Sequence, residues 1–176
     1  MKTDSSSPNQ ITDYLLTRAD YNLSQQSLNL KQSQVQDEMD FLGGIGRSFK
    51  IMSEYQVEDP FAPESPLVVN IGCLTGTAYM TGLRTYFTAY SPLKRTIQGA
   101  PMASWSAMSG SFGRKYRSTG LDDLVLTGLA ARPSILVLRQ GSDGPEISLD
   151  DAPDSMIGAD TPEKFKWLNE NYNQPK

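Results

Sequence analysis

Residues 66–93 read PLVVNIGCLTGTAYMTGLRTYFTAYSPL, a stretch with a predicted strand at each end and an unusual connection between them. The apolar run LVVNI at 67–71 predicts a buried strand, and the alternation in RTYFTAYS at 84–91 predicts a second one. From residue 72 onward the stretch contains three glycines and five threonines. A core strand does not require so many glycines and small hydroxyl residues around one arginine. We therefore expect this backbone to approach a ligand or another segment closely.

Glycines and small hydroxyl residues around a cation are a composition typical of anion binding. Glycine lets backbone N–H groups approach phosphate oxygens, and a guanidinium adds a planar set of donors. The candidates here are Gly76, Thr77 and Arg84, and the hydroxyls of Thr75 and Thr81 could add donors. The alternative is that the glycines serve tight turns and that Arg84 lies at a solvated strand end.

Two further segments could contribute to such a site. Gly44 and Gly46 belong to a glycine turn, and Gly46 is expected to open a helix whose N-terminus could meet an anion. A short helix is predicted over SGSFGRKYRSTG, residues 109–120, with Ser109 as its N-cap and Gly120 just past its end.

Composition excludes several classes of chemistry. The chain of 176 residues has no histidine, which excludes imidazole catalysis and histidine-bound zinc. Its single cysteine, Cys73, cannot hold an iron–sulfur cluster, which takes about four thiolates, and is expected to be buried and inert. The net charge of −4 argues against nucleic acid and anionic membranes as partners, and no apolar run is long enough to span a bilayer.

The remaining segments predict an α+β fold with a mixed or antiparallel sheet and a few short helices. Residues 1–19 are expected to be a disordered or partner-ordered leader on a cytoplasmic protein, and 20–176 a single partial domain. The other expected elements are a hairpin in 21–31, helices in 34–42 and 47–56, a loop or ragged hairpin at 94–107, strands at 122–128 and 133–140, and a hairpin on the turn GSDG.

Charged residues elsewhere are expected to be structural. The pairs Asp122-Asp123 and Asp150-Asp151 are predicted to be solvated, as is the cluster RKYR at 114–117. The last helix should begin at a capping box of Asp160 with Glu163, or alternatively with Thr161 as the cap, and Phe165 and Leu168 should pin it to the sheet.

Three long segments resemble the N-terminal domain of the tungsten-containing aldehyde ferredoxin oxidoreductases. They are YNLSQQSLNLKQSQVQDEMDFLGGIG (21–46), DPFAPESPLVVNIGCLTGTAYMTGLRTYFTAYSPL (59–93) and FGRKYRSTGLDDLVLTGLAARPSILVL (112–138). The pieces LTGT, R and SPL, followed by FG, G, D, TG and ARP, occur in the family's order. The resemblance covers about residues 20–150.

The resemblance implies a cofactor and the residues that hold it. In that family the domain is a base for a metal bound by two pterin dithiolenes, with an arginine and glycine turns at the pterin phosphates and magnesium. Arg84 matches the phosphate-contacting arginine, and Ser109 and Gly110 fall in the family's Asn-Ser-Gly-Gly turn, with Ala107 at the place of the asparagine. The implied cofactor is a tungsten- or molybdenum-bis-pterin, with magnesium as a further candidate.

These features predict the small subunit of a split pterin oxidoreductase. A larger, cysteine-containing partner chain would supply the rest of the family fold, the iron–sulfur cluster and the catalytic acid and base groups, so that a hetero-oligomer is expected. This chain carries no catalytic residue and no protein ligand to a metal in that interpretation. The alternative, which the substitution by Ala107 allows, is a structural or cofactor-handling subunit that kept the scaffold but lost the pterin site.

Overall fold

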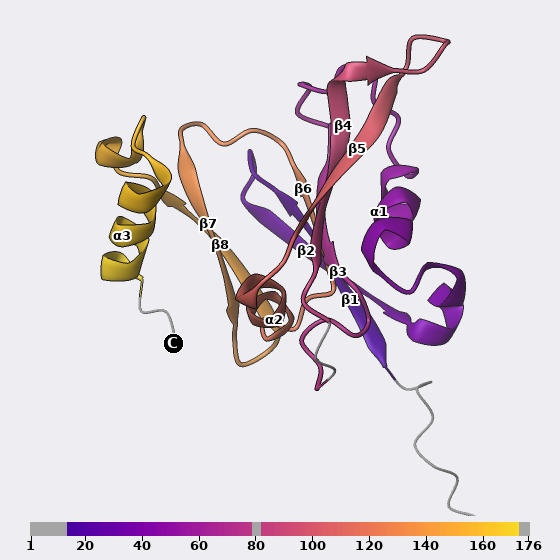
Figure 1. Ribbon diagram of the computed structural model, residues 1–176, viewed down its shortest axis with the longest axis horizontal. Coiled ribbons are helices and arrows are strands. Elements are labelled where there is room, and N and C mark those ends of the chain that lie inside the picture. Colours follow the sequence, from indigo (N-terminus) through magenta and orange to yellow (C-terminus); the bar gives the residue numbers. More distant parts are fainter. Residues whose placement is uncertain (1–13, 79–81, 173–176) are drawn as a thin grey trace, which may run out of the picture.

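A six-stranded mixed sheet forms the centre of the molecule in the computed structural model, which describes residues 14–78 and 82–172 (Figure 1). The strand order is β2-β1-β6-β3-β4-β5, with β1 and β6 parallel and the other neighbours antiparallel. The strands are β1 (Leu15–Asn22), β2 (Ser27–Gln34), β3 (Leu67–Ile71), β4 (Thr85–Arg95), β5 (Pro101–Met108) and β6 (Asp123–Thr127). The prediction of an α+β fold with a mixed sheet is confirmed.

Helices and a second hairpin cover the two faces of this sheet. Figure 1 shows α1 on one side, with α2 and the β7–β8 hairpin on the other and α3 beyond that hairpin. The bounds are η2 (Val35–Phe41, a 3-10 helix), α1 (Gly44–Met52), α2 (Ser111–Arg117), β7 (Ser134–Gln140), β8 (Pro145–Asp151), η3 (Asp154–Met156, a 3-10 helix) and α3 (Thr161–Asn171). No helix in the described ranges is long and apolar enough to cross a membrane.

The sheet has an apolar core on each face. Val68 of β3 packs with Ile51 and Met52 of α1 on one face, while its neighbour Val69 packs with Tyr116 of α2 on the other. Successive side chains of a strand point to opposite faces, so a strand covered on both sides is apolar throughout. This explains why residues 67–71 form a nearly continuous apolar run.

The folded domain begins earlier than expected. Strand β1 starts at Leu15 and pairs with both β2 and β6, and Leu16 and Ala19 are fully buried. A leader that extends to residue 19 is therefore wrong for residues 15–19. Residues 1–13 lie outside the described part of the chain, as does Thr81.

Three local predictions about helix ends meet different outcomes. The N-cap of α2 is Gly110, with a positive φ of 102° and no side-chain cap, so the prediction of Ser109 as the cap is wrong. Helix α1 begins at Gly44 rather than after Gly46. In α3 the capping box of Asp160 with Glu163 is present, which confirms the first of the two alternatives.

Two loosely specified segments are now defined. The loop or ragged hairpin predicted at 94–107 belongs to the long β4–β5 hairpin, whose register shifts between Tyr90 and Arg95. Helix α3 buries none of its side chains, and Phe165 is 62% exposed, so this residue does not pin the helix to the sheet. The hydroxyl of Tyr172 instead donates to Asp150 of β8 at 2.7 Å.

Candidate functional site

The predicted anion-binding segments converge at one end of the sheet. Ile71, the last residue of β3, lies opposite Thr85 of β4, and Thr85 lies opposite Met108 of β5. The same end of the sheet therefore carries the turn after β3, the residue before β4 and the residues after β5. The turn at 43–46 joins them, because a Cβ on Gly43 would lie 2.7 Å from the carbonyl oxygen of Ile71. We call residues 43–46, 72–77, 82–84 and 109–110 the glycine end.

Glycine is required here because the backbones pack against one another. A Cβ on Gly82 would lie 2.2 Å from the carbonyl oxygen of Leu74, far inside van der Waals contact. A Cβ on Gly113 of α2 would lie 2.8 Å from the Thr75 methyl group and 3.0 Å from the Leu83 carbonyl oxygen. The expectation of close approach is thus met, but the immediate neighbours of these glycines are other parts of the same chain.

The glycines before α1 have different surroundings. Gly44 has a φ of +60°, is buried, and lies beside the ring of Tyr86, where a Cβ would come within 3.1 Å. Its carbonyl accepts a hydrogen bond from Asn70 at 2.9 Å. Gly46 is exposed in the first turn of α1, and only Phe41 comes within 4.0 Å of its Cβ position. Of these two candidates, Gly46 is the one that a ligand could reach.

Most amides of the 72–77 turn are already used within the protein. Thr75 donates to Gly72, Thr77 to Leu74 and Gly76 to Gly82, all through backbone N–H groups. The Thr75 hydroxyl is buried and donates to the carbonyl of Arg84 at 3.1 Å, while the Thr77 hydroxyl donates to Leu74 at 2.8 Å. Gly76 and Thr77 therefore shape the turn, and their amides are not free donors.

Arg117 of α2 organises this turn. Its guanidinium donates to the carbonyl of Thr75 through Nε and to those of Gly72 (2.9 Å) and Cys73 (3.2 Å) through Nη2. Its Nη1 donates to the Tyr14 hydroxyl and lies 3.4 Å from the Asp122 carboxylate. The prediction that RKYR forms a solvated cluster is thus wrong for Arg117. Its only sequence signal was its position one helical turn after Gly113.

Arg84 is exposed and carries the free cation of the glycine end. Within residues 14–78 and 82–172, no hydrogen bond or ion pair involves its guanidinium. Its carbonyl is held by Thr75, so the backbone at this position is fixed while the side chain remains available. Exposed apolar side chains lie near it in sequence or across the sheet: Leu74, Leu83, Met108 and Phe112.

The segment between β5 and α2 lies beside Arg84 but makes few contacts. Ser109 and Gly110 are both exposed, and nothing lies within 4 Å of the Cβ position of Gly110. Glycine is needed here for its positive φ rather than for space. Cys73 is also exposed, so the expectation that it is buried is wrong.

The donor set at the glycine end fits a phosphate-bearing group rather than a directly bound metal. The described residues contain no group of three or more His, Cys, Asp or Glu that could hold a metal ion. The guanidinium of Arg84, which has no partner among the described residues, is suited to a phosphate oxygen. A phosphorylated pterin could be held by its phosphate here, with Arg84 as the cation.

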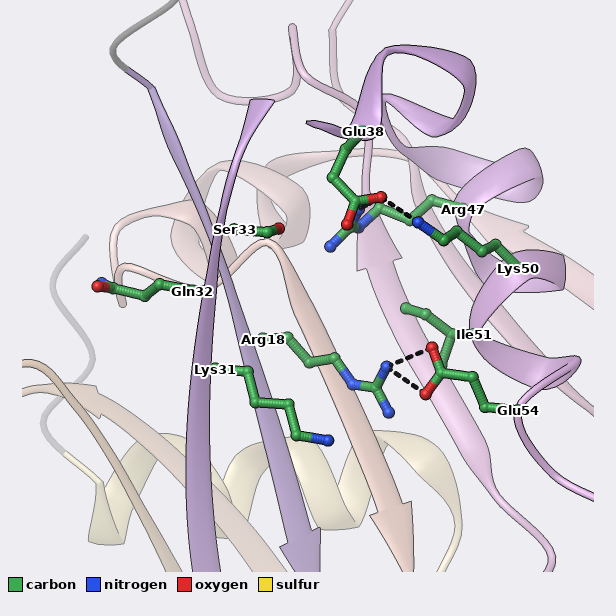
Figure 2. A pocket seen from close by; sticks show the side chains of 9 residues that line it. All are labelled: Arg18, Lys31, Gln32, Ser33, Glu38, Arg47, Lys50, Ile51 and Glu54. Atoms are coloured by element: carbon green, nitrogen blue, oxygen red, sulfur yellow. Dashed lines mark hydrogen bonds and ion pairs between the residues drawn. The ribbon is translucent and has the colours of Figure 1, made fainter. Parts of the chain in front are cut away.

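A second polar feature lies across the sheet under α1. Its volume is about 240 Å³, and we call it the charged cavity. Figure 2 shows the side chains that line it: Arg18, Lys31, Gln32, Ser33, Glu38, Arg47, Lys50, Ile51 and Glu54. Arg18 donates to both carboxylate oxygens of Glu54, and both Arg47 and Lys50 pair with Glu38. Lys31 pairs with Asp20 at 2.6 Å, so each cation of this cavity has a carboxylate partner and the network holds η2 and α1 against the sheet.

The acidic pair at the start of β6 is buried, not solvated as expected. Asp122 is 4% exposed and accepts from the Thr17 amide (2.9 Å) and the Tyr14 hydroxyl (2.8 Å). Asp123 is 0% exposed and forms an ion pair with Arg47 at 2.5 Å. Burial raises the pKa of Asp123 to about 6, although the charge of Arg47 acts in the opposite direction. The two acids anchor arginines on opposite faces of the sheet.

The family of this chain follows from comparison with known proteins. The family model "aldehyde ferredoxin oxidoreductase, N-terminal domain" matches residues 20–176, and the chain belongs to this family. Tungsten-containing aldehyde ferredoxin oxidoreductases of Pyrococcus abyssi and Pyrococcus furiosus are each 32% identical to it, over 95 and 81 residues. These matches cover 54% and 46% of this chain but only 15% and 12% of the relatives. The chain thus spans a small part of their length.

A solved structure shows the same fold. It is the active site complex BamBC of benzoyl coenzyme A reductase in complex with 1,5 dienoyl-CoA, with a TM-score of 0.77 and 23% identity. The match covers 91% of this chain and 23% of the other. The family resemblance and the fold class deduced from the sequence are both confirmed.

Proposed function

We propose that this chain is the small subunit of a split tungsten- or molybdenum-pterin oxidoreductase and helps to hold the cofactor. One observation carries the proposal: the exposed Arg84, whose guanidinium has no partner in the part of the chain that the structure describes, lies among close-packed glycine turns at one end of the sheet. A cation without a carboxylate partner, surrounded by tightly fixed backbone, is suited to a phosphate. Membership in the aldehyde ferredoxin oxidoreductase family supports a phosphorylated pterin as its source.

Each candidate residue has a separate task in this proposal. Arg84 contacts the phosphate, and magnesium would accompany that phosphate. Gly76 and Thr77 shape the turn beside it, while Ser109 and Gly110 offer exposed backbone on the other side. Gly46 offers the first turn of α1, and Gly44 keeps that turn packed under Tyr86. The metal-pterin, when bound, supplies the oxidation–reduction chemistry.

The proposed partner is a larger chain with the iron–sulfur cluster and the catalytic acid and base groups. The matched regions make up 15% and 12% of the two relatives, whose remaining length lies outside the match. Four exposed apolar side chains, which a protein partner could cover, are Leu74, Leu83, Met108 and Phe112. The similar fold in the BamBC active site complex is consistent with work in an assembly.

The test is metal analysis of the natively purified complex with variants of one residue. Arg84→Ala should lower the tungsten or molybdenum content per chain at least fivefold, while subunit association is retained. Arg114→Ala is the matched control, because Arg114 is also exposed and no hydrogen bond or ion pair of its side chain occurs among the described residues. Unchanged metal content in Arg84→Ala would contradict the cofactor role, and a complex without either metal would favour the scaffold that lost its site.

A further inference from the structure

The two amides in the 72–77 turn that remain free are those of Cys73 and Leu74. Every other N–H from Gly72 to Thr77 donates within the protein, including Gly72 to the Thr75 hydroxyl. Neither Cys73 nor Leu74 donates a backbone hydrogen bond to any described residue. Two successive free N–H groups in an otherwise saturated turn are an anion-binding arrangement.

The direction of these two amides follows from Arg117. In a trans peptide the C=O and the next N–H lie in one plane and point in opposite directions. Nη2 of Arg117 binds the carbonyl oxygens of Gly72 and Cys73 on the α2 side of the turn. The N–H groups of Cys73 and Leu74 therefore point away from Arg117.

Arg117 is fixed and cannot itself serve as the ligand's cation. All three nitrogens of its guanidinium have partners within the protein. The Asp122 carboxylate that balances its charge is held by Tyr14 and by the Thr17 amide. The guanidinium thus fixes the geometry of the turn, and its donors are already occupied.

Gly43, the residue before α1, lies beside the Cys73 nitrogen. A Cβ at position 43 would lie 3.2 Å from the Cys73 nitrogen, and Gly43 has none. Its φ of +154° also disfavours any residue with a side chain. The absence of a side chain at this position leaves the approach to the Cys73 nitrogen less crowded.

We propose that Arg117 is a positioning residue that holds the N–H groups of Cys73 and Leu74 outward as a pair of phosphate donors beside Arg84. The inference rests on the proposed function and assigns two backbone donors, which residue type alone does not identify. The ligand class is a phosphate monoester or diphosphate, bound by two amides and one guanidinium.

Hydrogen exchange at single-residue resolution, measured on the full chain with any subunit that accompanies it, tests this inference. Inorganic phosphate is the probe, and its affinity is measured in parallel by equilibrium dialysis. Phosphate should slow exchange of the Cys73 and Leu74 amides saturably in the unmodified protein. Arg117→Met should weaken phosphate binding at least tenfold, and Arg117→Lys should restore only part of it, since an ammonium cannot reach three carbonyls at once.

The outcomes separate the inference from the proposed function. Arg114→Met, in the same helix, is the control and should leave phosphate affinity unchanged. If Arg84→Met weakens phosphate binding while exchange at Cys73 and Leu74 does not respond to phosphate, the inference is overturned and the role of Arg84 stands. If the unmodified protein binds no phosphate, both are overturned. The exchange measurement needs no variant, so it decides even if Arg117→Met fails to fold.

Discussion

Arg47 in the charged cavity and Arg84 at the glycine end are both arginines on the central sheet or its helix, but their surroundings differ. Arg47 is 5% exposed and pairs with Asp123 and Glu38. Arg84 is exposed, and its guanidinium has no partner among the described residues. The comparison shows that a cluster of charges is not by itself a sign of a ligand site.

Charge balance is the quantity that separates the two regions. In the charged cavity Arg18 pairs with Glu54 and Lys50 pairs with Glu38 (Figure 2). Arg47 also pairs with Glu38, and Lys31 pairs with Asp20, so an incoming anion would have to displace a carboxylate. Next to the glycine end, Arg117 is neutralised by Asp122 and binds backbone carbonyls of the 72–77 turn, whereas Arg84 has no partner among the described residues. The first region contributes to stability and the second to the proposed function.

The largest expected effect is the loss of stability in Arg47→Met. The substitution leaves the Asp123 carboxylate buried without its cation, which costs about 3–5 kcal/mol when one partner of a buried pair is removed. Urea unfolding at pH 7 measures it. The loss should be smaller at pH 5, because Asp123 with a pKa of about 6 is then largely protonated.

Arg84→Met is the matching substitution at the glycine end. It removes the same type of side chain from an exposed position, so the free energy of unfolding should change by less than about 0.5 kcal/mol. Equal destabilisation by the two variants would show that Arg84 has a structural partner and would remove the contrast between the regions.

The pH dependence of the free energy of unfolding should reveal the raised pKa of the buried Asp123. Because burial raises its pKa from 3.8 to about 6, the folded protein binds more protons than the unfolded chain between these values. The contribution of Asp123 to the free energy of unfolding therefore falls as pH rises from about 4 to 6, by up to about 3 kcal/mol. Asp123→Asn should abolish this slope in urea unfolding at a series of pH values.

The pKa of Glu38 is shifted in the opposite direction to that of Asp123, so the effect of Glu38 on the pH dependence of stability has the opposite sign. Burial opposes its ionisation, but the Lys50 hydrogen bond and the charge of Arg47 lower its pKa overall. Its stabilisation is therefore present above its unfolded pKa and is lost as pH falls. The difference between the unmodified protein and Asp123→Asn isolates the Asp123 contribution, and identical pH profiles for the two would contradict it.

Alanine substitutions at two positions of the glycine end should change stability by smaller amounts and in opposite directions. Gly82→Ala places a methyl group 2.2 Å from the Leu74 carbonyl oxygen, which should destabilise the protein by about 1–3 kcal/mol and disturb the 72–77 turn. Gly46→Ala meets nothing closer than 4.0 Å and should stabilise α1 by about 0.5–1 kcal/mol. Thermal unfolding measures both, and a neutral Gly82→Ala would show that the two backbones do not pack as described.

Sequence reasoning identified the segments of the site but not their internal roles. The hydroxyl and glycine content of 72–94 pointed to close backbone approach, and the approach occurs at Gly82 and Gly113. It did not reveal that Thr75, Gly76 and Thr77 use their amides within the protein. Which amides find a partner, as Gly76 does at the Gly82 carbonyl, is set by the turn geometry and not by residue type.

Burial of polar residues was the other quantity that local patterns could not predict. Asp122 and Asp123 looked like a solvated pair and Arg117 like part of a solvated cluster, yet the fold buries both acids and half-buries the arginine. Charged residues are rarely buried unless paired, and the partners here are distant in sequence: Asp123 pairs with a residue 76 positions away. Cys73, expected to be buried, is exposed in the turn after β3.

The amino-acid sequence by itself determined the family, the α+β class, the strand and helix order, and the capping box of α3, because these depend on periodicity and on residues close in the chain. Only the tertiary structure decided that the 43–46 and 72–77 turns meet, that all donors of Arg117 are used, and that Arg84 has no partner among the residues described. Whether a charge is neutralised depends on which distant groups the sheet brings within a few ångströms. That physical difference separates a structural ion pair from a candidate binding site.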